Sequence, residues 1–468
     1  MAKIKSARAR QLIDCKCRPM VEVDIWADTG VLGRGSAPTG TSVGMHEAFV
    51  LRDGEPGEYG GLSVHKAVEN VNAIIGPAIV GMDVSDQRAI DERMIALDGT
   101  PDKRKLGGNA IASVSIACLR AAAAVADMPV YQYLRGRWPA GSGRAAGKAA
   151  AAEGGCPGAG GATGADQAAG PAGAGRAGAA AGPLKTVPVP TFNVINGGRG
   201  GKIIQPFNEF ILVPYKAASI YEAVEIAVKC FQRLEKTLSA YLGGPPAVAG
   251  SYGWAAPSDD PAVVLGLMAE AAADCGYADK VAFALDCAAS EMYDRESGSY
   301  LLLGERVSAQ AQIDYVKGLS EKYPLVFVED LLDENDWENY PKAKERIGKT
   351  LIIGDDLIVS NTDRLRRAYE SEAIDGFILK PNQAGTLTEA LDTHRFAAER
   401  GLLSITSGRS GGVVDDIVMD LSVGLDLALI KNGAPRSGER ITKLNFLMRA
   451  CELSPGCKMA DISPLLRF

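Results

Sequence analysis

The sequence predicts an α/β protein in which a smaller α+β domain precedes a (β/α) barrel. Four short apolar runs within residues 281–380, VAFALD, LVFVE, LIIGD and GFILK, alternate with segments long enough for a helix. This is the pattern of consecutive strand-helix modules with buried parallel strands. Residues 20–126 instead place strand patterns first and helical patterns afterwards, which is typical of an α+β unit. At 468 residues, the chain is long enough for both.

The elements of the smaller domain follow from local patterns. Residues 20–30 (MVEVDIWADTG) alternate apolar and polar side chains, which predicts an antiparallel strand with one exposed face. Residues 37–44 (APTGTSVG) are small and rich in hydroxyls, and we expect a mobile loop over a site. Helices are predicted next at residues 64–79, 86–97 and 110–126. We therefore assign residues 1–137 to an N-terminal capping domain.

Residues 138–184 consist mostly of Ala and Gly and contain almost no large apolar side chain. Such a segment buries too little surface to offset the entropy lost on ordering, so we predict a disordered insert.

The barrel is expected over residues 185–468. Its further elements are predicted as strands in VPVPTFNVINGG (187–198), EFILVP (209–214), LSIT (403–406) and LALIKNGAP (427–435), and as helices at 220–241 and 437–451.

Charge and cysteine content limit the partners and the compartment. The net charge of -7 argues against nucleic acid or an anionic membrane surface as the main partner. The basic start, MAKIKSARARQLIDCK, lacks the apolar core of a signal peptide, and no stretch has the apolar length of a membrane span. Nine cysteines without CxxC pairing favour a reduced cytoplasm over a disulfide framework.

Each of the four apolar runs ends on an ionisable residue. These residues are Asp286, Glu329, Asp355 and Lys380. The carboxyl ends of barrel strands converge on one face, where barrel enzymes have their active sites. Three converging carboxylates would repel one another unless a hard divalent cation lay among them, and oxygen ligands alone favour Mg²⁺. Lys380 would then face a metal-bound substrate, although each residue could instead be a strand end turned to solvent.

A family resemblance extends over the chain outside the Ala/Gly insert. The motifs PTGTSVGMHEAFVLRDG, LDGTPDKRKLGGNAI, FNVINGG, ALDCAASE, FVEDLLDENDW, GDDL, LKPNQAGT, GRSG and IKNGAPRSGER resemble those of enolase in order and spacing. The resemblance implies a small capping domain and a (β/α)₈ barrel with an atypical ββαα start. It also implies two Mg²⁺ ions per active site and a homo-oligomer.

The resemblance also assigns roles to individual residues. It makes Asp286, Glu329 and Asp355 the ligands of the first Mg²⁺ and Ser42 a ligand of the second. It makes Lys380 the base that removes the proton next to the substrate carboxylate, a role that requires a neutral amine, and neighbouring cations would lower its pKa. The remaining implied roles are carboxylate binding by Lys431, phosphate binding by Arg409 and Ser410, and acid catalysis by Glu209.

The departures from enolase lie in the expected pocket. Tyr252 stands where enolases have the glutamate that assists departure of hydroxide, and a phenol with a pKa near 10 is a poor replacement. Gly200 and Gly408 stand where enolases have histidines, and Asn208 replaces a glutamine. The turn after NGG also gains two cations, Arg199 and Lys202. A roomier and more basic pocket suits a substrate larger or more anionic than 2-phosphoglycerate.

Together these features predict a diverged Mg²⁺-dependent enzyme acting on a phosphoglycerate- or phosphoenolpyruvate-like acid. The pattern of losses is similar to that expected of the enolase homologues of phosphonate and phosphinate biosynthesis, of the carboxyphosphonoenolpyruvate synthase type. The expected partner is a phosphorylated or phosphonate carboxylic acid, with Tyr252 included among the catalytic candidates. Two alternatives stay open: a phosphopyruvate hydratase with a rearranged site, and a non-catalytic protein that uses the enolase fold for binding.

Overall fold

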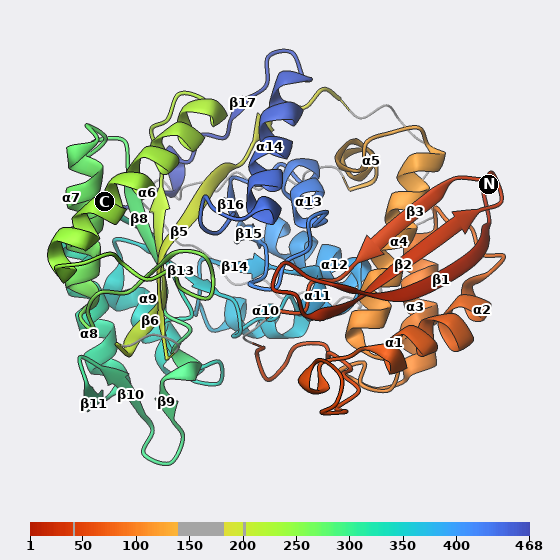
Figure 1. Cartoon of the computed structure of the whole chain (residues 1–468), viewed down its shortest axis with the longest axis horizontal. Helices are drawn as coiled ribbons and strands as arrows, with labels where there is room; N and C mark the ends of the chain where they lie inside the picture. The colour runs from red at the N-terminus through yellow and green to blue at the C-terminus, as the bar shows by residue number, and fades with distance from the viewer. Residues whose placement is uncertain (41–42, 139–181, 200–202) are drawn as a thin grey trace, which may run out of the picture.

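The computed structural model describes residues 1–40, 43–138, 182–199 and 203–468. Figure 1 shows the smaller N-terminal part on one side and the barrel on the other, with α5 (Val130–Arg137) close to α13 (Val418–Gly424) between them. The expected Ala/Gly insert falls almost entirely outside the described residues. The strands and helices otherwise follow the predicted order, with α+β elements first and the barrel second.

The N-terminal part is an antiparallel meander covered by helices. Its strands are β1 (Ile4–Ile13), β2 (Pro19–Ala27) and β3 (Leu32–Ser36), in the order β1-β2-β3. The helical elements are α1 (His65–Asn70), a π-helical turn (Val71–Ile75), α2 (Gly76–Ile79), α3 (Gln87–Asp98), α4 (Gly108–Val125) and α5, with a 3₁₀ turn at Tyr59–Gly61. The three predicted helical regions are thus confirmed, and so is a strand within residues 20–30. The predicted exposed face of that strand is wrong, because β2 is mostly buried and only its Trp26 is exposed.

Helix α4 packs directly on this meander because the strand beneath it presents glycine. A Cβ atom at Gly35 would lie 2.4 Å from the backbone nitrogen of Ala117, and one at Gly33 would lie 2.2 Å from its carbonyl oxygen. Only the absence of a side chain allows the helix to approach this closely. Contrary to the expectation that no stretch has the apolar length of a membrane span, this helix is long and apolar enough, the one such helix among the described residues. It serves as a core helix here, because 83% of that stretch is buried in the protein.

The barrel consists of eight strands that close on themselves. They are β5 (Val189–Gly198), β6 (Gln205–Val213), β8 (Ala282–Asp286), β12 (Leu325–Glu329), β13 (Leu351–Gly354), β14 (Gly376–Leu379), β15 (Leu403–Ser407) and β16 (Leu429–Lys431). Each strand pairs with the next, and β16 pairs with β5. Strand β6 runs antiparallel to both of its neighbours, and two helices lie between β6 and β8 in the sequence. The barrel therefore begins with two strands and two helices, which is the atypical ββαα start.

Helices surround the barrel. They are α6 (Ile220–Leu242), α7 (Pro261–Asp274), α8 (Ala309–Lys322), α9 (Asn339–Ile347), α10 (Thr362–Glu370), α11 (Pro381–Ala384), α12 (Leu387–Glu399), α13 and α14 (Gly438–Glu452). Helix α6 matches the prediction because Ser219 caps its start, accepting a hydrogen bond from the Glu222 N–H, and Gly243 ends it with a φ of 67°.

Short elements complete the described chain. They are β4 (Thr186–Val187), β7 (Trp254–Ala255), β9 (Tyr293–Asp294), β10 (Ser299–Leu302), β11 (Glu305–Val307), β17 (Lys458–Met459), and 3₁₀ turns at Ala289–Glu291 and Ser463–Leu465. An apolar cluster of inward-facing strand residues, including Val189, Ala284, Ile353 and Ile378, fills part of the barrel.

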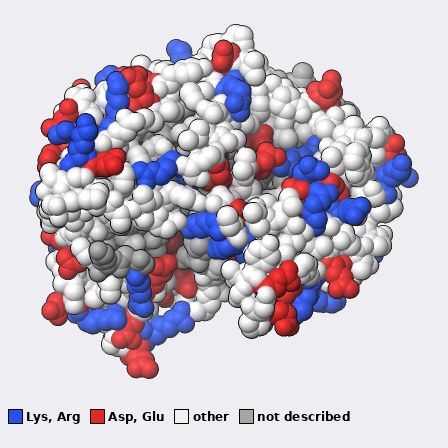
Figure 2. Space-filling model, viewed as in Figure 1, with Lys and Arg blue, Asp and Glu red and all other residues white. Residues whose placement is uncertain are grey.

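Figure 2 shows basic and acidic side chains interspersed over one face of the molecule, without a broad area of one sign.

Candidate active site

The strand register brings acidic residues together at the carboxyl end of the barrel. Asp286, the last residue of β8, pairs with Glu209 on β6 and with Glu329, the last residue of β12. On the other side of the barrel, Lys431 on β16 pairs with Ser407 on β15. The apolar runs that predicted these strands therefore end at one face, as the barrel geometry requires.

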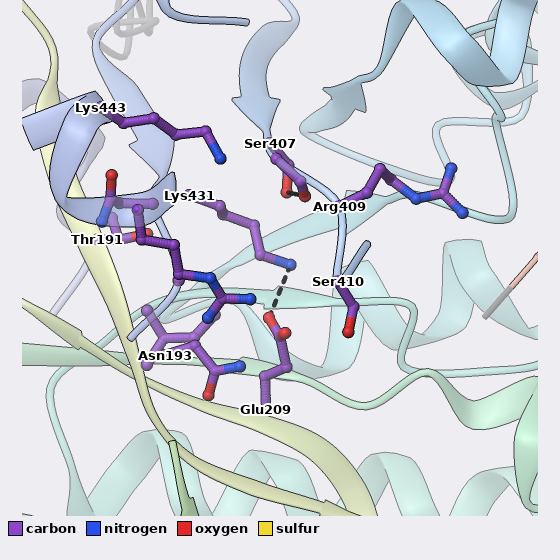
Figure 3. A pocket seen from close by; sticks show the side chains of 13 residues that line it. Thr191, Asn193, Glu209, Ser407, Arg409, Ser410, Lys431 and Lys443 are labelled. Atoms are coloured by element: carbon purple, nitrogen blue, oxygen red, sulfur yellow. Dashed lines mark hydrogen bonds and ion pairs between the residues drawn. The ribbon is translucent and has the colours of Figure 1, made fainter. Parts of the chain in front are cut away.

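Lys431 lies at the centre of this acidic group. Its Nζ is 2.5 Å from Glu329 Oε2, 3.1 Å from Asp286 Oδ2 and 3.3 Å from Glu209 Oε2. Burial opposes the charge on the amine, but the three carboxylates, led by Asp286, outweigh burial and raise the pKa of Lys431 well above its usual value. Lys431 is therefore held as a cation that offsets part of the acidic charge. Figure 3 shows its amine directed at Glu209.

Lys380 and Asp355 form a second ion pair in the same pocket. The Lys380 Nζ contacts Asp355 Oδ2, and Gln383 Nε2 donates a hydrogen bond to Asp355 Oδ1 at 2.9 Å. The expected lowering of the Lys380 pKa is not found in this arrangement. Burial lowers it, but the attraction of Asp355 is large enough that the pKa of Lys380 is raised. The amine is protonated for as long as this contact is kept.

Asp355 also belongs to a cluster that the sequence reasoning did not identify. Asp330, Asp355 and Asp356 each offer a carboxylate oxygen, and these atoms lie within 4.8 Å of one another, close enough to share a cation. The Asp330 carboxylate accepts the backbone N–H groups of Asp355 at 2.8 Å and Asp356 at 2.7 Å. Burial, with the Asp355 and Asp286 carboxylates, raises the pKa of Asp330 to about 8. Asp330 follows Glu329 directly. The two adjacent acidic residues at the end of this strand were the one feature of the sequence that could have pointed to Asp330 as a site residue.

The donor set fits a hard divalent cation. The ligand atoms on offer are carboxylate oxygens, which suit Mg²⁺. Glu329 is fully buried, and its Oε1 has no hydrogen-bond partner within the described part of the chain. A buried carboxylate oxygen left in this way is costly unless a cation or a proton accompanies it. Three carboxylates are expected to bind the first Mg²⁺. Two of them, Asp286 and Glu329, form ion pairs with Lys431, whereas the third, Asp355, forms an ion pair with Lys380.

The expected phosphate-binding pair has partners from distant segments. The Arg409 guanidinium donates to both carboxylate oxygens of Glu47, and the pair is buried. Ser410 Oγ accepts a hydrogen bond from Lys16 Nζ at 2.5 Å and lies 2.8 Å from Ser251 Oγ. Sequence reasoning missed Glu47, Lys16 and Ser251, because nothing local in the sequence indicates these long-range contacts.

Tyr252 is not brought into the pocket. Its hydroxyl donates a hydrogen bond to the Cys15 carbonyl at 2.7 Å, and its ring lies beneath the Arg440 guanidinium at 5.4 Å. The tyrosine backbone has a φ of 68°, and the preceding Ser251 lines the pocket whereas Tyr252 does not. The geometry therefore does not support the expectation that the Tyr252 hydroxyl acts as a catalytic group in the pocket.

The central pocket has a volume of about 470 Å³. Arg199 and Asn208 line it, as expected from the NGG turn and the start of β6, and so does Gly408. Lys202, Gly200 and Ser42 lie outside the described residues. The full lining consists of Arg199, Asn208, Glu209, Ser251, Asp286, Ala288, Glu291, Asp330, Asp355, Asp356, Lys380, Ser407, Gly408, Arg409, Ser410 and Lys431. Glu329 stands behind this surface, in contact with Lys431.

Two family models match the chain. The model described as enolase, N-terminal domain, matches residues 4–134, and the model described as enolase, C-terminal TIM barrel domain, matches residues 184–460. The second match alone extends over more than half of the 468 residues. The closed eight-strand barrel, its antiparallel second strand and the preceding small domain agree with both matches. This chain belongs to the enolase family.

Proposed function

We propose that the protein is a Mg²⁺-dependent enzyme acting on a three-carbon phosphorylated carboxylic acid of the 2-phosphoglycerate or phosphoenolpyruvate type. The main support is the gathering of Glu209, Asp286 and Glu329 around Lys431. A pocket that combines carboxylates with lysines can hold an anionic acid through a divalent cation and through direct ion pairs. Members of the enolase superfamily are generally enzymes, which agrees with this proposal.

We assign Asp286, Glu329 and Asp355 to the first Mg²⁺ and Ser42 to the second. Bound Mg²⁺ would neutralise the charge that builds on a carboxylate when the neighbouring proton leaves. Lys380 is the base in this assignment. Because the Asp355 carboxylate raises the pKa of Lys380, the amine must give up this contact before it can accept a proton.

We further infer that the reaction is a group transfer of the carboxyphosphonoenolpyruvate synthase type. A hydroxyl oxygen of the three-carbon acceptor bonds to the phosphorus of a nucleotide-activated carboxyphosphonate. The phosphorus–oxygen bond to the nucleotide breaks, and a nucleoside monophosphate leaves with that electron pair. The hydroxyl proton passes to solvent, and Lys380 keeps its assignment to the proton next to the acceptor carboxylate. Lys431 binds the acceptor carboxylate, while Arg409 and Ser410 bind a phosphate or phosphonate.

Two observations favour transfer over dehydration. The Tyr252 hydroxyl is bound to the Cys15 carbonyl outside the pocket, so it supplies no acid for a departing hydroxide. Gly408 lines the pocket without a side chain, next to the Lys443 amine, and Arg199 adds a cation to the lining. One observation favours the alternative, a phosphopyruvate hydratase. The Glu209 carboxylate lines the pocket, and general acid catalysis by such a group contributes about 10²- to 10⁴-fold.

Two assays separate these functions. The protein is incubated with 2-phosphoglycerate and Mg²⁺, and formation of phosphoenolpyruvate is followed. It is then incubated with the mixed anhydride of a nucleoside monophosphate and phosphonoformate, together with the same acceptor, and release of the nucleoside monophosphate is followed for each of the common bases. We expect nucleotide release that requires both the acceptor and Mg²⁺, and phosphoenolpyruvate formation slower by about 10²-fold or more.

Rapid formation of phosphoenolpyruvate would establish the hydratase instead. Calorimetric titration with Mg²⁺ and phosphoenolpyruvate tests the third reading, a non-catalytic binding protein. Metal-dependent binding without turnover of any substrate pair would support that reading. Glu329→Gln is the matched negative control for all three measurements, because it removes one charge from the assigned metal site while keeping the shape of the side chain.

A further inference from the structure

A small side cavity adjoins the central pocket, with Gly408 in the lining of both. Its volume is about 30 Å³, room for two to three water-sized groups. It shares Glu209, Ser407, Gly408, Arg409, Ser410 and Lys431 with the central pocket. The residues that only the side cavity adds are Thr191, Asn193, Ile211, Asn432, Gly433, Arg440 and Lys443. Figure 3 shows this cavity, with Thr191 and Asn193 on the side opposite Arg409 and Ser410.

Three of the added residues, all uncharged and polar, have side-chain atoms without hydrogen-bond partners in the described part of the chain. This holds for Thr191 Oγ1 and for both amide atoms of Asn193 and Asn432. All three residues are at least nine-tenths buried, with exposed fractions of 1%, 2% and 2%. A buried donor or acceptor without a partner costs about 1–3 kcal/mol, so such groups are normally satisfied by water or a ligand. Three of them facing one cavity indicate a site for a polar group.

The charges around the cavity favour an anion. Its charged lining residues are four basic ones, Arg409, Lys431, Arg440 and Lys443, and one acidic one, Glu209. These cations form ion pairs with carboxylates that do not line the cavity, and the pairs hold the basic side chains in position. One example is the ion pair between the Lys443 amine and Glu439. The lining thus offers an anion these cations together with the unpartnered hydroxyl and amide donors of Thr191, Asn193 and Asn432.

Gly408 lies where the two cavities share their lining. A Cβ atom at this position would lie 2.7 Å from the Lys443 Nζ, which is shorter than a normal contact. Any side chain at residue 408 would therefore have to displace the lysine amine. The glycine keeps the cavity continuous with the phosphate-binding pair, Arg409 and Ser410.

We propose that the side cavity binds a carboxylate attached directly to the phosphorus of the second substrate. This inference rests on the proposed transfer reaction. With the phosphorus near Arg409 and Ser410, its carboxyl group would pass Gly408 and accept hydrogen bonds from Thr191, Asn193 and Asn432. A carboxylate has three heavy atoms and fits the volume, whereas a tetrahedral phosphonate group is too large.

Calorimetry with two phosphonates tests the cavity directly. Phosphonoformate carries a carboxylate on phosphorus, and methylphosphonate carries a methyl group there. With Mg²⁺ present, we expect the wild-type protein to bind phosphonoformate at least about tenfold more tightly. Thr191→Val removes the hydroxyl at nearly constant volume, and Asn432→Leu removes the amide. Each should reduce the preference to less than about threefold and leave the affinity for methylphosphonate unchanged.

Thr237→Val is the matched control. Thr237, on α6, is also buried with an unpartnered hydroxyl, and it lines neither cavity. It should keep the wild-type preference. Phosphonoformate can also bind Mg²⁺ through its carboxylate, so an unchanged preference in both Thr191→Val and Asn432→Leu would overturn the side-cavity site. Failure of wild-type protein to bind either phosphonate would also overturn it.

The nucleotide-release assay keeps this inference separate from the proposed function. Nucleotide release by the wild-type protein, with the ligand preference unchanged in both variants, would reject the side cavity alone. Loss of the preference in both variants, without nucleotide release from any donor, would reject the transfer reaction and retain the carboxylate site. A thermal unfolding curve for each variant confirms that the binding measurements are made on folded protein.

Discussion

Arg409, two residues beyond β15, donates two hydrogen bonds to the carboxylate of Glu47 in the loop that follows β3. The distances are 2.8 Å from Nη1 to Oε2 and 3.1 Å from Nη2 to Oε1. The side chains are 5% and 2% exposed, so water screens this pair little. The contact joins the N-terminal part of the chain to the residue assigned to phosphate binding. A phosphate that binds Arg409 must therefore compete with Glu47 or share the guanidinium with it.

Replacing Glu47 should make stability depend on phosphate. Glu47→Gln removes the carboxylate from a buried charge pair, and breaking such a pair costs about 3–5 kcal/mol. Inorganic phosphate should restore part of this loss by supplying a new anion for Arg409. Thermal unfolding with and without phosphate measures both effects. Glu338→Gln is the control, because its pair with Lys342 is exposed to solvent and should contribute little to stability. Equal stabilisation of wild-type and Glu47→Gln protein by phosphate would contradict the prediction.

The barrel and its acidic residues could be predicted because a short stretch of sequence is enough to identify each strand and the residue at its end. Each apolar run marks a buried strand, and the ionisable residue that ends it is placed at the carboxyl face by the barrel itself. Asp286 and Glu329 were predicted in this way, and they meet at Lys431. The position of Lys431 was inferred only from the IKNGAP motif, since a lone lysine after a short strand carries no chemical signal of its own.

The rest of the site depends on contacts that a single sequence does not encode locally. Glu47 and Arg409 are separated by 362 positions, and Lys16 and Ser410 by 394. Tyr252 was assigned to the pocket from its motif position, but its hydroxyl donates a hydrogen bond to the carbonyl of Cys15, 237 positions away.

Tyr252→Phe should have little effect on catalysis. The lost hydrogen bond to the Cys15 carbonyl should lower stability by about 1 kcal/mol. Because the hydroxyl lies outside the pocket, we expect kcat for the transfer assay to change by less than about threefold. A catalytic phenol would instead lose about 10²-fold or more on this substitution. Steady-state kinetics combined with chemical unfolding distinguishes the two outcomes.

His394 should make stability fall in mild acid. Its ring, on α12, contacts Ser404 Oγ at 3.0 Å, and burial lowers the pKa of His394 from 6.5 to about 4. The unfolded chain therefore takes up a proton between pH 6.5 and 4 that the folded protein excludes, so the stability contributed by the neutral ring is lost as the pH falls through this range. Between pH 7 and pH 5 the loss should be about 2 kcal/mol.

Urea unfolding of wild-type and His394→Gln protein at these two pH values measures this contribution. The substitution should remove most of the histidine-dependent slope. His65→Gln serves as a control of opposite sign, because Glu58 raises the pKa of that exposed histidine, so its small contribution is lost as the pH rises. A slope that is the same in wild-type and His394→Gln protein would show that the ring titrates alike in both states.

Lys380→Ala should separate proton removal from metal binding. The Lys380 amine contacts the Asp355 carboxylate, so a cation bound to Asp355 must compete with it. Without the amine, Mg²⁺ affinity should be kept or increased, while exchange of the acceptor's α-proton with deuterated solvent should fall by about 10²-fold or more. NMR follows the exchange, and calorimetry follows Mg²⁺. Lys342→Ala, on the exposed face of α9, should change neither. Undiminished exchange in Lys380→Ala would exclude Lys380 as the base, whereas loss of both properties would show that the lysine mainly holds the acidic residues in place.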